Sequence, residues 1–417
     1  MPLLATFLRA AMLSGGCLAS LSAQQTWTVN AAGGAQFVDI GAAVAAAASG
    51  DAIVVAAGAY APFVVDGKSL VIVGTNVNVV TPGIGAGPVP PTIEIKNLGA
   101  GQMLRMAGIG ITHFVPGPAA LRVADCTGTV WVESAFVDAF GAPSIVVERC
   151  ADVVLAECTA QTNRGTVTAS GAPISLPGAR LVDATVRIVG GEYRGSTGVL
   201  QGAAFPQLSA PPNGGDGLVA VDAQVRIASG RFLGGAGTSY WTGTCTIGGN
   251  GGDGVQTETL GGTPTLVRAD GPFLQGGGGG NSTCGGTAVP GVWVNMLAGL
   301  FVLDPGYGRI LRCAPTVTGP AALPIEVVGR PGDLAIVCVG LPVASGAVLG
   351  LPMSLSTSQP IVTLGTVSIG LFGRATLQVA IPALPPGLPD LQYAVQSLVL
   401  DAAGGPTATN PRTLLLR

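Results

Sequence analysis

The chain has 417 residues, only 10% of them charged, and a formal net charge of −3 at pH 7. This near-neutral, slightly acidic balance lacks the basic surface of nucleic-acid-binding proteins, and we expect no nucleic-acid partner. The 66 glycines and 31 prolines indicate many turns, whereas abundant valine, leucine and isoleucine argue against disorder. Turn formers between short β-branched runs predict a fold of many short strands.

The first 23 residues have the composition of a secretory signal peptide. Arg9 is the only charge among the first 38 residues, and "AAMLSGGCLASLSA" forms a short apolar core that ends in small residues. We predict cleavage after Ala23, with Ser22 an equally suitable site. Lipid attachment at Cys17 is the alternative, disfavoured because a serine stands three residues before it, where a large aliphatic residue is usual. We therefore expect the mature chain to be secreted or displayed at the cell surface.

Residues 334–373 contain no charge, which raises the question of a membrane span. Glycine and proline interrupt this segment repeatedly, and serine and threonine are scattered through it. A spanning helix needs about 20 consecutive apolar residues with every main-chain bond satisfied inside the segment. We therefore predict buried strands and turns here, with no transmembrane span in the mature chain.

The segment from Ser49 to Gly74, "SGDAIVVAAGAYAPFVVDGKSLVIVG", contains short apolar runs separated by tight corners. Before it, "DIGAAVAAAASG" (39–50) has an N-cap candidate, an alanine-rich body and a glycine stop, which predicts a short helix. Repeated short strands with corners indicate a solenoid rather than a sandwich.

The segment also resembles the first turns of right-handed parallel β-helix proteins of the pectin-lyase-like group, in which an entry helix caps the coil. The residues that match that pattern are Gly50, Asp51, Ile53, Val55, Gly58, Tyr60, Val73 and Gly74. The resemblance implies an all-β, right-handed parallel β-helix with a short N-terminal capping helix.

Internal repeats support the same fold. "LRVADCTGTVWVES" (121–134) aligns with "IVVERCADVVLAEC" (145–158) at a shift of 24 residues, the size of one coil. "LVDATVRIVGGEYRG" (181–195) recurs as "AVDAQVRIASGRFLG" (220–234) at a shift of 39, and again in degraded form at 265–276. Glycine-rich insertions account for the longer shift, and we interpret them as loops that leave one corner. The predicted β-helix covers residues 26–295.

Strand alternation predicts which side chains of these repeats face inward. Tyr193, Phe232 and Phe273 align at one position and are expected to stack inside the coil. Glu192 is expected to lie beside Arg231 on the adjacent coil.

The last part of the chain differs, because the glycine-rich repeats end. Residues 310–417 alternate short strands with proline-rich turns, which predicts a small C-terminal β-sandwich. Its end resembles the β-sandwich modules of secreted bacterial proteins. The residues that carry this resemblance are Tyr393, Val395, Gln396, Asp401, Asn410 and Leu414.

The catalytic motifs of two related enzyme classes are absent from the sequence. The only histidine, His113, is in neither a His-Gly motif nor the company of an Arg-x-Lys motif, which argues against polygalacturonase-like hydrolysis. The pectinesterase motifs are missing as well.

Pectate-lyase-like chemistry needs carboxylates for Ca²⁺ and a basic residue to take a proton beside the uronate carboxyl. The outward side chains Asp183, Asp222, Arg187 and Arg226 supply these residue types, with either arginine as the base. The alternative, which we favour, is that they pair with each other and solvate the coil. Asp183 and Asp222 are then candidates for ligand binding only.

A calcium motif is a second open question. "NGGDG" occurs at 213–217 and at 250–254, and "GGNGGDGVQ" fits one calcium-binding nonapeptide. Asp216 and Asp253 could meet on neighbouring coils and bind Ca²⁺. We favour glycine-rich turns instead, with no metal and no other cofactor.

Eight cysteines fit an oxidising compartment, and one of them leaves with the signal peptide. Cys126 and Cys150 share a coil position, within the range of a disulfide. We also predict pairs between Cys245 and Cys284, which bracket a glycine-rich insertion, and between Cys313 and Cys338 in the tail.

Tyr240 and Trp241 lie in an insertion and are candidates for stacking on sugar rings, or for packing the insertion onto the coil. The sequence as a whole favours a secreted or surface-displayed β-helix protein with a structural or binding role, polysaccharide as its candidate ligand, and no catalysis. The alternative is a calcium-dependent uronate lyase.

Overall fold

A computed structural model describes the chain at residues 25–80, 90–167, 172–198, 211–241, 244–269, 272–284, 287–303, 310–313, 316–317, 319–329, 332–340, 342–348, 351–355, 361–370, 374–381, 391–401, 406–409 and 412–416. The predicted signal peptide and its cleavage sites lie outside these residues. The described chain is almost entirely β-structure, with one short helix, α2 (Ile40–Ala46). None of its helices is long and apolar enough to cross a bilayer.

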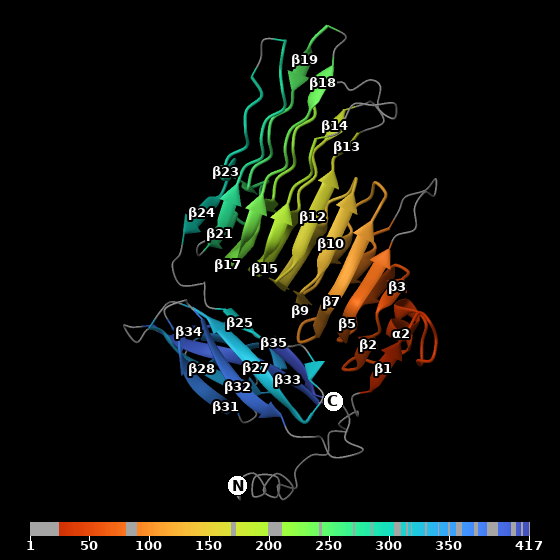
Figure 1. Ribbon diagram of the computed structural model, residues 1–417, viewed down its shortest axis with the longest axis vertical. Helices are drawn as coiled ribbons and strands as arrows, with labels where there is room; N and C mark the ends of the chain where they lie inside the picture. Colours follow the sequence, from red (N-terminus) through yellow and green to blue (C-terminus); the bar gives the residue numbers. More distant parts are fainter. Residues whose placement is uncertain are drawn as a thin grey trace, which may run out of the picture.

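One large sheet of parallel strands forms the body of the molecule, and its strands lie side by side in Figure 1. Its members are β1 (Thr26–Val29), β2 (Ala52–Val55), β3 (Gly58–Tyr60), β4 (Phe63–Asp66), β5 (Val71–Val80), β6 (Ile93–Lys96), β7 (Met103–His113), β8 (Leu121–Ala124), β9 (Thr129–Glu133), β10 (Phe136–Phe140), β11 (Ile145–Ala156), β12 (Thr159–Arg164), β15 (Ala179–Arg194), β16 (Leu218–Val221), β17 (Gln224–Leu233), β20 (Val255–Glu258), β21 (Leu266–Ala269), β22 (Phe273–Gln275), β23 (Val294–Met296) and β24 (Leu300–Leu303).

The strand registers resolve this sheet into three parallel ladders. The first contains β2, β9, β21 and β24, the second β3, β10, β12 and β22, and the third β4, β6, β8, β16, β20 and β23. The long strands β5, β7, β11, β15 and β17 each run through two ladders. The chain visits the three ladders in turn, and we call each passage a coil. This arrangement is consistent with a parallel β-helix.

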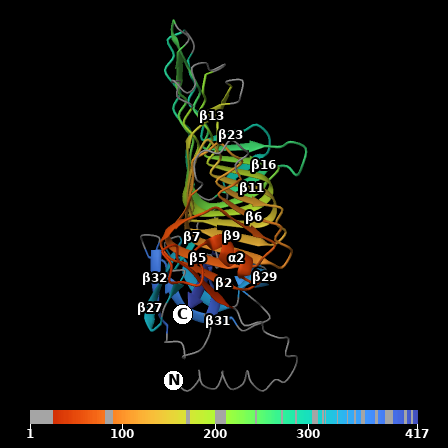
Figure 2. The ribbon, with the colours of Figure 1, turned by 90° about the vertical axis from the view of Figure 1, so that its right-hand side faces the viewer.

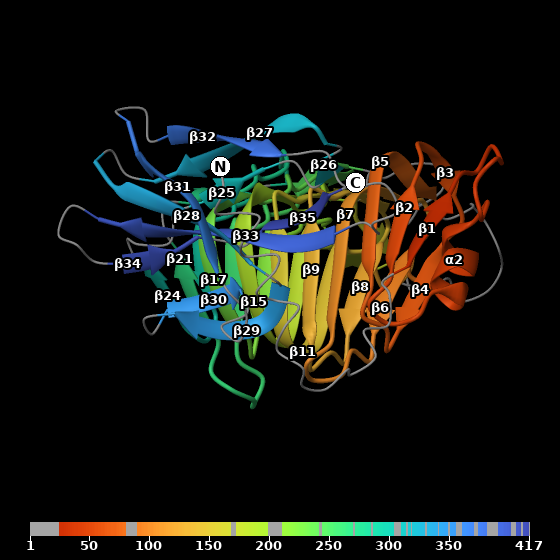
Figure 3. The ribbon, with the colours of Figure 1, turned by 90° about the horizontal axis from the view of Figure 1, so that it is seen from below.

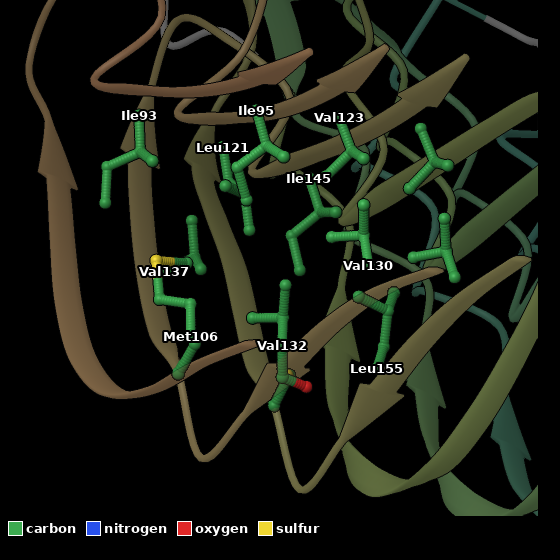
Figure 4. Packing of buried hydrophobic residues seen from close by; sticks show 14 of the residues in the cluster. Ile93, Ile95, Met106, Leu121, Val123, Val130, Val132, Val137, Ile145 and Leu155 are labelled. Carbon is green, nitrogen blue, oxygen red and sulfur yellow. The ribbon is translucent and has the colours of Figure 1, made fainter. Parts of the chain in front are cut away.

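The interior of the coils is a continuous apolar column, part of which Figure 4 shows at close range. Val132 and Leu155 are buried on neighbouring coils of the first ladder, as strand alternation requires. The predicted stack of Tyr193 on Phe232 is confirmed, with ring centroids 5.1 Å apart and the rings nearly parallel. The prediction for Phe273 is wrong, because it aligns with Arg231 and faces outward while Leu274 takes the inner position.

The N-terminal end of the coils is capped, as the sequence predicts. Asp39 is the N-cap of α2, and its carboxylate accepts a hydrogen bond from the Ala42 N–H at 3.0 Å. At the other end of the helix, Lys68 Nζ donates to the carbonyls of Val44, Ala45 and Ala47. A cation at this position also complements the helix dipole.

The glycine-rich insertions form an ordered bundle that projects from the coils and reaches β18 (Ser239–Trp241) and β19 (Thr246–Gly248) at its far end, a projection that Figures 1 and 2 show from two sides. We call it the glycine bundle and define it by the segments 195–198, 211–217, 234–238, 248–254, 276–280 and 289–293. The chain leaves the second ladder through one layer of the bundle and returns to the third ladder through the other.

Main-chain hydrogen bonds hold the bundle together at a spacing of three residues. Within the outgoing layer, Gly234 and Gly237 donate to Gln275 and Gly278, both at 2.8 Å. Between layers, successive glycines form a relay in which Gly215 donates to Ser196, Gly235 to Gly215, Gly252 to Gly235, Gly277 to Gly252 and Gly291 to Gly277, at 2.7–2.9 Å. A three-residue period is that of a polyproline II helix, which has no hydrogen bonds of its own. Neighbouring segments therefore satisfy each other.

Close approach, rather than unusual backbone angles, explains the glycines. A Cβ at Gly235 would lie 1.8 Å from the Ser196 carbonyl oxygen, and one at Gly252 would lie 2.0 Å from that of Gly215. Neither residue has a positive φ. Only a residue without a side chain fits where two main chains meet this closely.

The C-terminal residues form two facing sheets over a core of their own, which we call the C-terminal pair. One sheet contains β25 (Ile310–Arg312), β27 (Ala321–Val328) and β32 (Arg374–Ile381). The other contains β26 (Thr316–Val317), β28 (Leu334–Gly340), β31 (Val362–Ser368), β33 (Leu391–Leu400), β34 (Pro406–Ala408) and β35 (Arg412–Leu416). Three small hairpins complete the fold: β13 (Thr166–Val167) with β14 (Pro173–Ile174), β18 with β19, and β29 (Pro342–Val348) with β30 (Leu351–Leu355).

The C-terminal pair packs against the flank of the coils opposite the glycine bundle, as Figures 1 and 3 show. Val328 joins a cluster with the outward residues Trp131 and Val154 of the first ladder. On the same ladder, Arg105 and Glu133 form a buried ion pair at 2.7 Å. The charged segment of the coil surface is thus paired before it is covered.

We expect Gly235→Ala to destabilise the bundle by about 1–3 kcal/mol, the usual cost of forcing an extra carbon into a packed site. The matched control is Gly278→Ala, because a Cβ at Gly278 meets nothing within 4 Å. Denaturant unfolding combined with hydrogen exchange of residues 234–254 measures the effect. Equal stability of the two variants would contradict the close-packed bundle.

Candidate functional site

The outer face of the second ladder carries two columns of side chains across five coils. We define this five-coil face by Phe136, Thr159, Glu192, Arg231 and Phe273 in one column and Asp138, Gln161, Arg194, Leu233 and Gln275 in the other. Because coils repeat at about 4.8 Å, the two phenylalanines that end the first column lie roughly 19 Å apart. The face is therefore long and runs across the strands.

Strand alternation explains why these residues point outward. The residues between them, such as Val137, Tyr193 and Phe232, are fully buried in the core. Phe136 and Phe273 are instead 49% and 51% exposed. Two half-exposed aromatic rings at the ends of a polar column are unusual for a surface that serves only solubility.

Glu192 is the charged centre of the face. Its carboxylate accepts hydrogen bonds from Arg194 at 3.1 Å and from Arg231 at 2.8 Å, so two guanidinium groups share one carboxylate and leave a net positive charge. The Arg231 guanidinium also lies over the Phe273 ring, 5.4 Å from its centroid. This contact holds the arginine on the surface by a cation–π interaction. The predicted neighbourhood of Glu192 and Arg231 is confirmed.

A hydrogen-bonded chain of amides continues the face toward the N-terminal coils. Gln161 donates to the Asn163 side-chain oxygen at 2.7 Å, and Asn163 donates to Asp138. Burial raises the pKa of Asp138, and the hydrogen bond from Asn163 opposes this shift. Fixed amide and carboxylate groups of this kind suit the hydroxyl groups of a polar ligand.

The face becomes a cleft where it meets the glycine bundle. A cavity of about 300 Å³ is lined by Arg194, Arg231 and Gln275, with the main chain of Gly234 and Gly277 along its wall. Both arginines are exposed, whereas Leu233 between them is buried. The cleft thus offers charged donors at its rim and main-chain surface beside them.

The residues named for lyase chemistry lie in two separate places. Asp183 and Asp222 occupy one corner of successive coils, and both have left-handed φ values of 48° and 50°. Aspartate and asparagine tolerate this conformation better than most residues, which gives both a conformational role at the corner. Arg187 and Arg226 align on the first ladder, and Arg187 bonds to Asp152 at 2.8 Å.

A shallow cavity of about 310 Å³ is present at the aspartate corner, lined by Asp183, Asp222, Arg149 and Gln224 among others. The Asp222 carboxylate accepts a hydrogen bond from the Leu260 N–H at 3.0 Å. The arginines of the first ladder do not line this cavity. A proton acceptor and a carboxylate group for a cation are therefore not brought together here.

Asp216 and Asp253 do meet on neighbouring segments of the glycine bundle. The Asp253 N–H donates to the Asp216 carboxylate at 2.6 Å, and the Asp253 carboxylate accepts from the Val292 N–H and the Asn295 amide. Their side chains thus replace main-chain acceptors in the bundle. Among the described residues, no group of three or more metal-ligating side chains is present.

Burial of Asp216, with the nearby charges of Asp253 and Glu258, raises its pKa from 3.8 to about 7. The folded state therefore binds a proton that the unfolded state releases, and stability should fall as the pH rises from about 4 to 7. At about 1.4 kcal/mol per pKa unit, we expect Asp216→Asn to stabilise the protein by about 2–4 kcal/mol at pH 8 and little at pH 4.

Denaturant unfolding across this pH range tests the prediction. Asp66→Asn, which changes an exposed aspartate, is the matched control and should leave the pH profile of the parent intact. Parallel profiles for the parent and Asp216→Asn would contradict the assignment.

The structure contains one of the three predicted disulfides. Cys245 and Cys284 are bonded, with their Cα atoms 5.3 Å apart, and the bond closes the outer part of the glycine bundle. Cys126 and Cys150 are neighbours but are not bonded; each thiol donates instead to a carbonyl two residues earlier, at 3.2 Å. A hydrogen bond from Cys150 to Cys126 lowers the pKa of Cys126 and raises that of Cys150.

The predicted bond between Cys313 and Cys338 is also wrong. Cys313 packs against the main core of the C-terminal pair, whereas Cys338 packs against a separate cluster with Leu355 and Ala394. The two thiols therefore lie in different environments.

Tyr240 and Trp241 belong by their main chain to β18, which pairs with β19 at the far end of the bundle. Their side chains lie outside the described residues. The sequence reasoning missed Phe136, Gln161 and Arg194, which carry much of the five-coil face. Alignment of all coils on the 24-residue and 39-residue repeats could have placed them in shared columns.

Comparisons with known proteins do not assign a family. No family model matches the chain, and no curated protein matches its sequence. A superoxide reductase from Ignicoccus hospitalis is similar at a TM-score of 0.18 and 8% identity, covering 26% of this chain and 80% of that one. Full-length tailspike protein 2 from a bacteriophage of Escherichia coli O157:H7 is similar at a TM-score of 0.22 and 12% identity, covering 88% of this chain and 62% of that one.

Proposed function

We propose that this protein is a secreted or surface-displayed β-helix protein that binds an extended polysaccharide along the five-coil face. The observation that carries the proposal is the pair of half-exposed rings, Phe136 and Phe273, at the two ends of a column of polar side chains. Aromatic rings contribute large contact area at little entropic cost, and their faces suit the apolar faces of sugars.

The spacing of the face favours a chain-like ligand over a compact one. A ligand that reaches both rings must extend roughly 19 Å along the coil axis, across the intervening coils. Between the rings, Thr159, Glu192 and Arg231 provide donors and acceptors at every coil. A linear polysaccharide matches this periodic arrangement, because it repeats its own hydroxyl groups along its length.

The finer fold assignments belong to the same proposal. The three ladders and the α2 cap support a right-handed, pectin-lyase-like β-helix, and the C-terminal pair is interpreted as a β-sandwich module. We propose a binding role without catalysis and without a cofactor. Lyase chemistry is the weaker candidate, because Arg187 is paired with Asp152 and the aspartates Asp183 and Asp222 lie at another corner.

Loss of one ring should weaken binding without unfolding the protein. A glycan-array screen of the full chain identifies the ligand, and calorimetry with an oligosaccharide of that ligand measures its affinity. We expect Phe273→Ala to weaken binding about tenfold or more, corresponding to about 1.4 kcal/mol or more, since the ring both contacts the sugar and supports Arg231.

Trp293→Ala is the matched control, because it removes an exposed aromatic ring that lies off the face, before the third-ladder strand β23. Its affinity for the oligosaccharide should equal that of the parent. Unchanged affinity in Phe273→Ala and in Phe136→Ala would overturn the proposed site. Unsaturated product from the oligosaccharide, lost in Arg187→Ala, would establish the lyase instead.

A further inference from the structure

The last coil ends without a cap. β23 pairs with β20, and β24 pairs with β21, but no strand of the described chain pairs with their other edges. Terminal repeats of solenoid proteins normally present a polar outer face, because an open end exposes both core side chains and unpaired main-chain groups. The first coil follows this rule through α2, and the last coil does not.

The open end is apolar and concave. Trp293 is 72% exposed and Leu297 is 64% exposed, and Met296 and Leu300 are also exposed beside them. A cavity of about 800 Å³ is lined there by Leu274, Val292, Trp293 and Phe301, among others. Leu274 and Phe301 belong to the core column of the coils and are only partly covered. A patch of this kind marks an interaction surface in a folded protein.

The sequence of this end lacks the usual protection of an exposed strand edge. Residues 287–303, "TAVPGVWVNMLAGLFVL", contain no charged side chain. Exposed edge strands commonly carry lysine or other charges that oppose pairing with another chain. Two such uncharged ends can approach without repulsion between like charges.

We propose that the open end is covered by the same end of a second copy of this chain. The opposite end of the coils is closed by α2, so a head-to-tail contact finds no free strand edge there. The C-terminal pair lies against another flank, at Trp131 and Val154. A two-fold axis places the β23 and β24 edges of one copy antiparallel to those of the other and forms a closed dimer.

The test is the mass of the full chain in solution, measured by size exclusion with light scattering at micromolar concentrations. We expect twice the monomer mass for the parent and a halving of that mass in Leu297→Lys, which places a charge in the apolar contact. Leu260→Lys is the matched control, because Leu260 is 73% exposed but lies away from the open end, and it should remain dimeric.

A monomeric parent would overturn the proposal. A dimer that persists in both Leu297→Lys and Met296→Lys would also overturn it, because the contact would then lie elsewhere. Trimers or open-ended filaments would exclude a closed two-fold contact. Circular dichroism of each variant separates loss of dimer from loss of fold, since a folded monomer of Leu297→Lys supports the proposal.

Discussion

The in-register stacking of parallel strands is the constraint on which the rest of the structure depends. Each coil places its residues directly beside those of the coil before, so an inward residue continues the core and an outward residue extends a column. The Tyr193–Phe232 stack, the Glu192–Arg231 pair and the aspartate corner are three consequences of one register. Any surface site on this protein is therefore repeated along the coil axis.

The glycine bundle continues the same stacking where side chains no longer decide it. Its segments alternate outgoing and returning directions, and main-chain hydrogen bonds replace the core as the source of order. The Asn250 and Asp253 side chains accept bonds from the neighbouring returning segment, so even the polar residues act as main-chain substitutes. The disulfide between Cys245 and Cys284 then closes the outer part of the arm.

The sequence predicts the capping helix, the strand faces and the Cys245–Cys284 bond, because each depends on local spacing or on a clear repeat. It fails for Phe273, because the degraded repeat aligns one residue away from the true register. The glycine bundle was interpreted as loops, since its order comes from main-chain contacts that leave no apolar pattern. The five-coil face escaped notice because its columns join residues separated by insertions of unequal length.

The most direct test of the central claim is a crystal structure of the full chain with a bound oligosaccharide identified by screening. The account predicts sugar density along the second ladder, with rings stacked on Phe136 or Phe273 and hydroxyl groups beside Arg231. Density confined to the aspartate corner, or to the far end of the glycine bundle, would contradict it. Such a result would move the binding function to a part of the protein where the coils serve only as support.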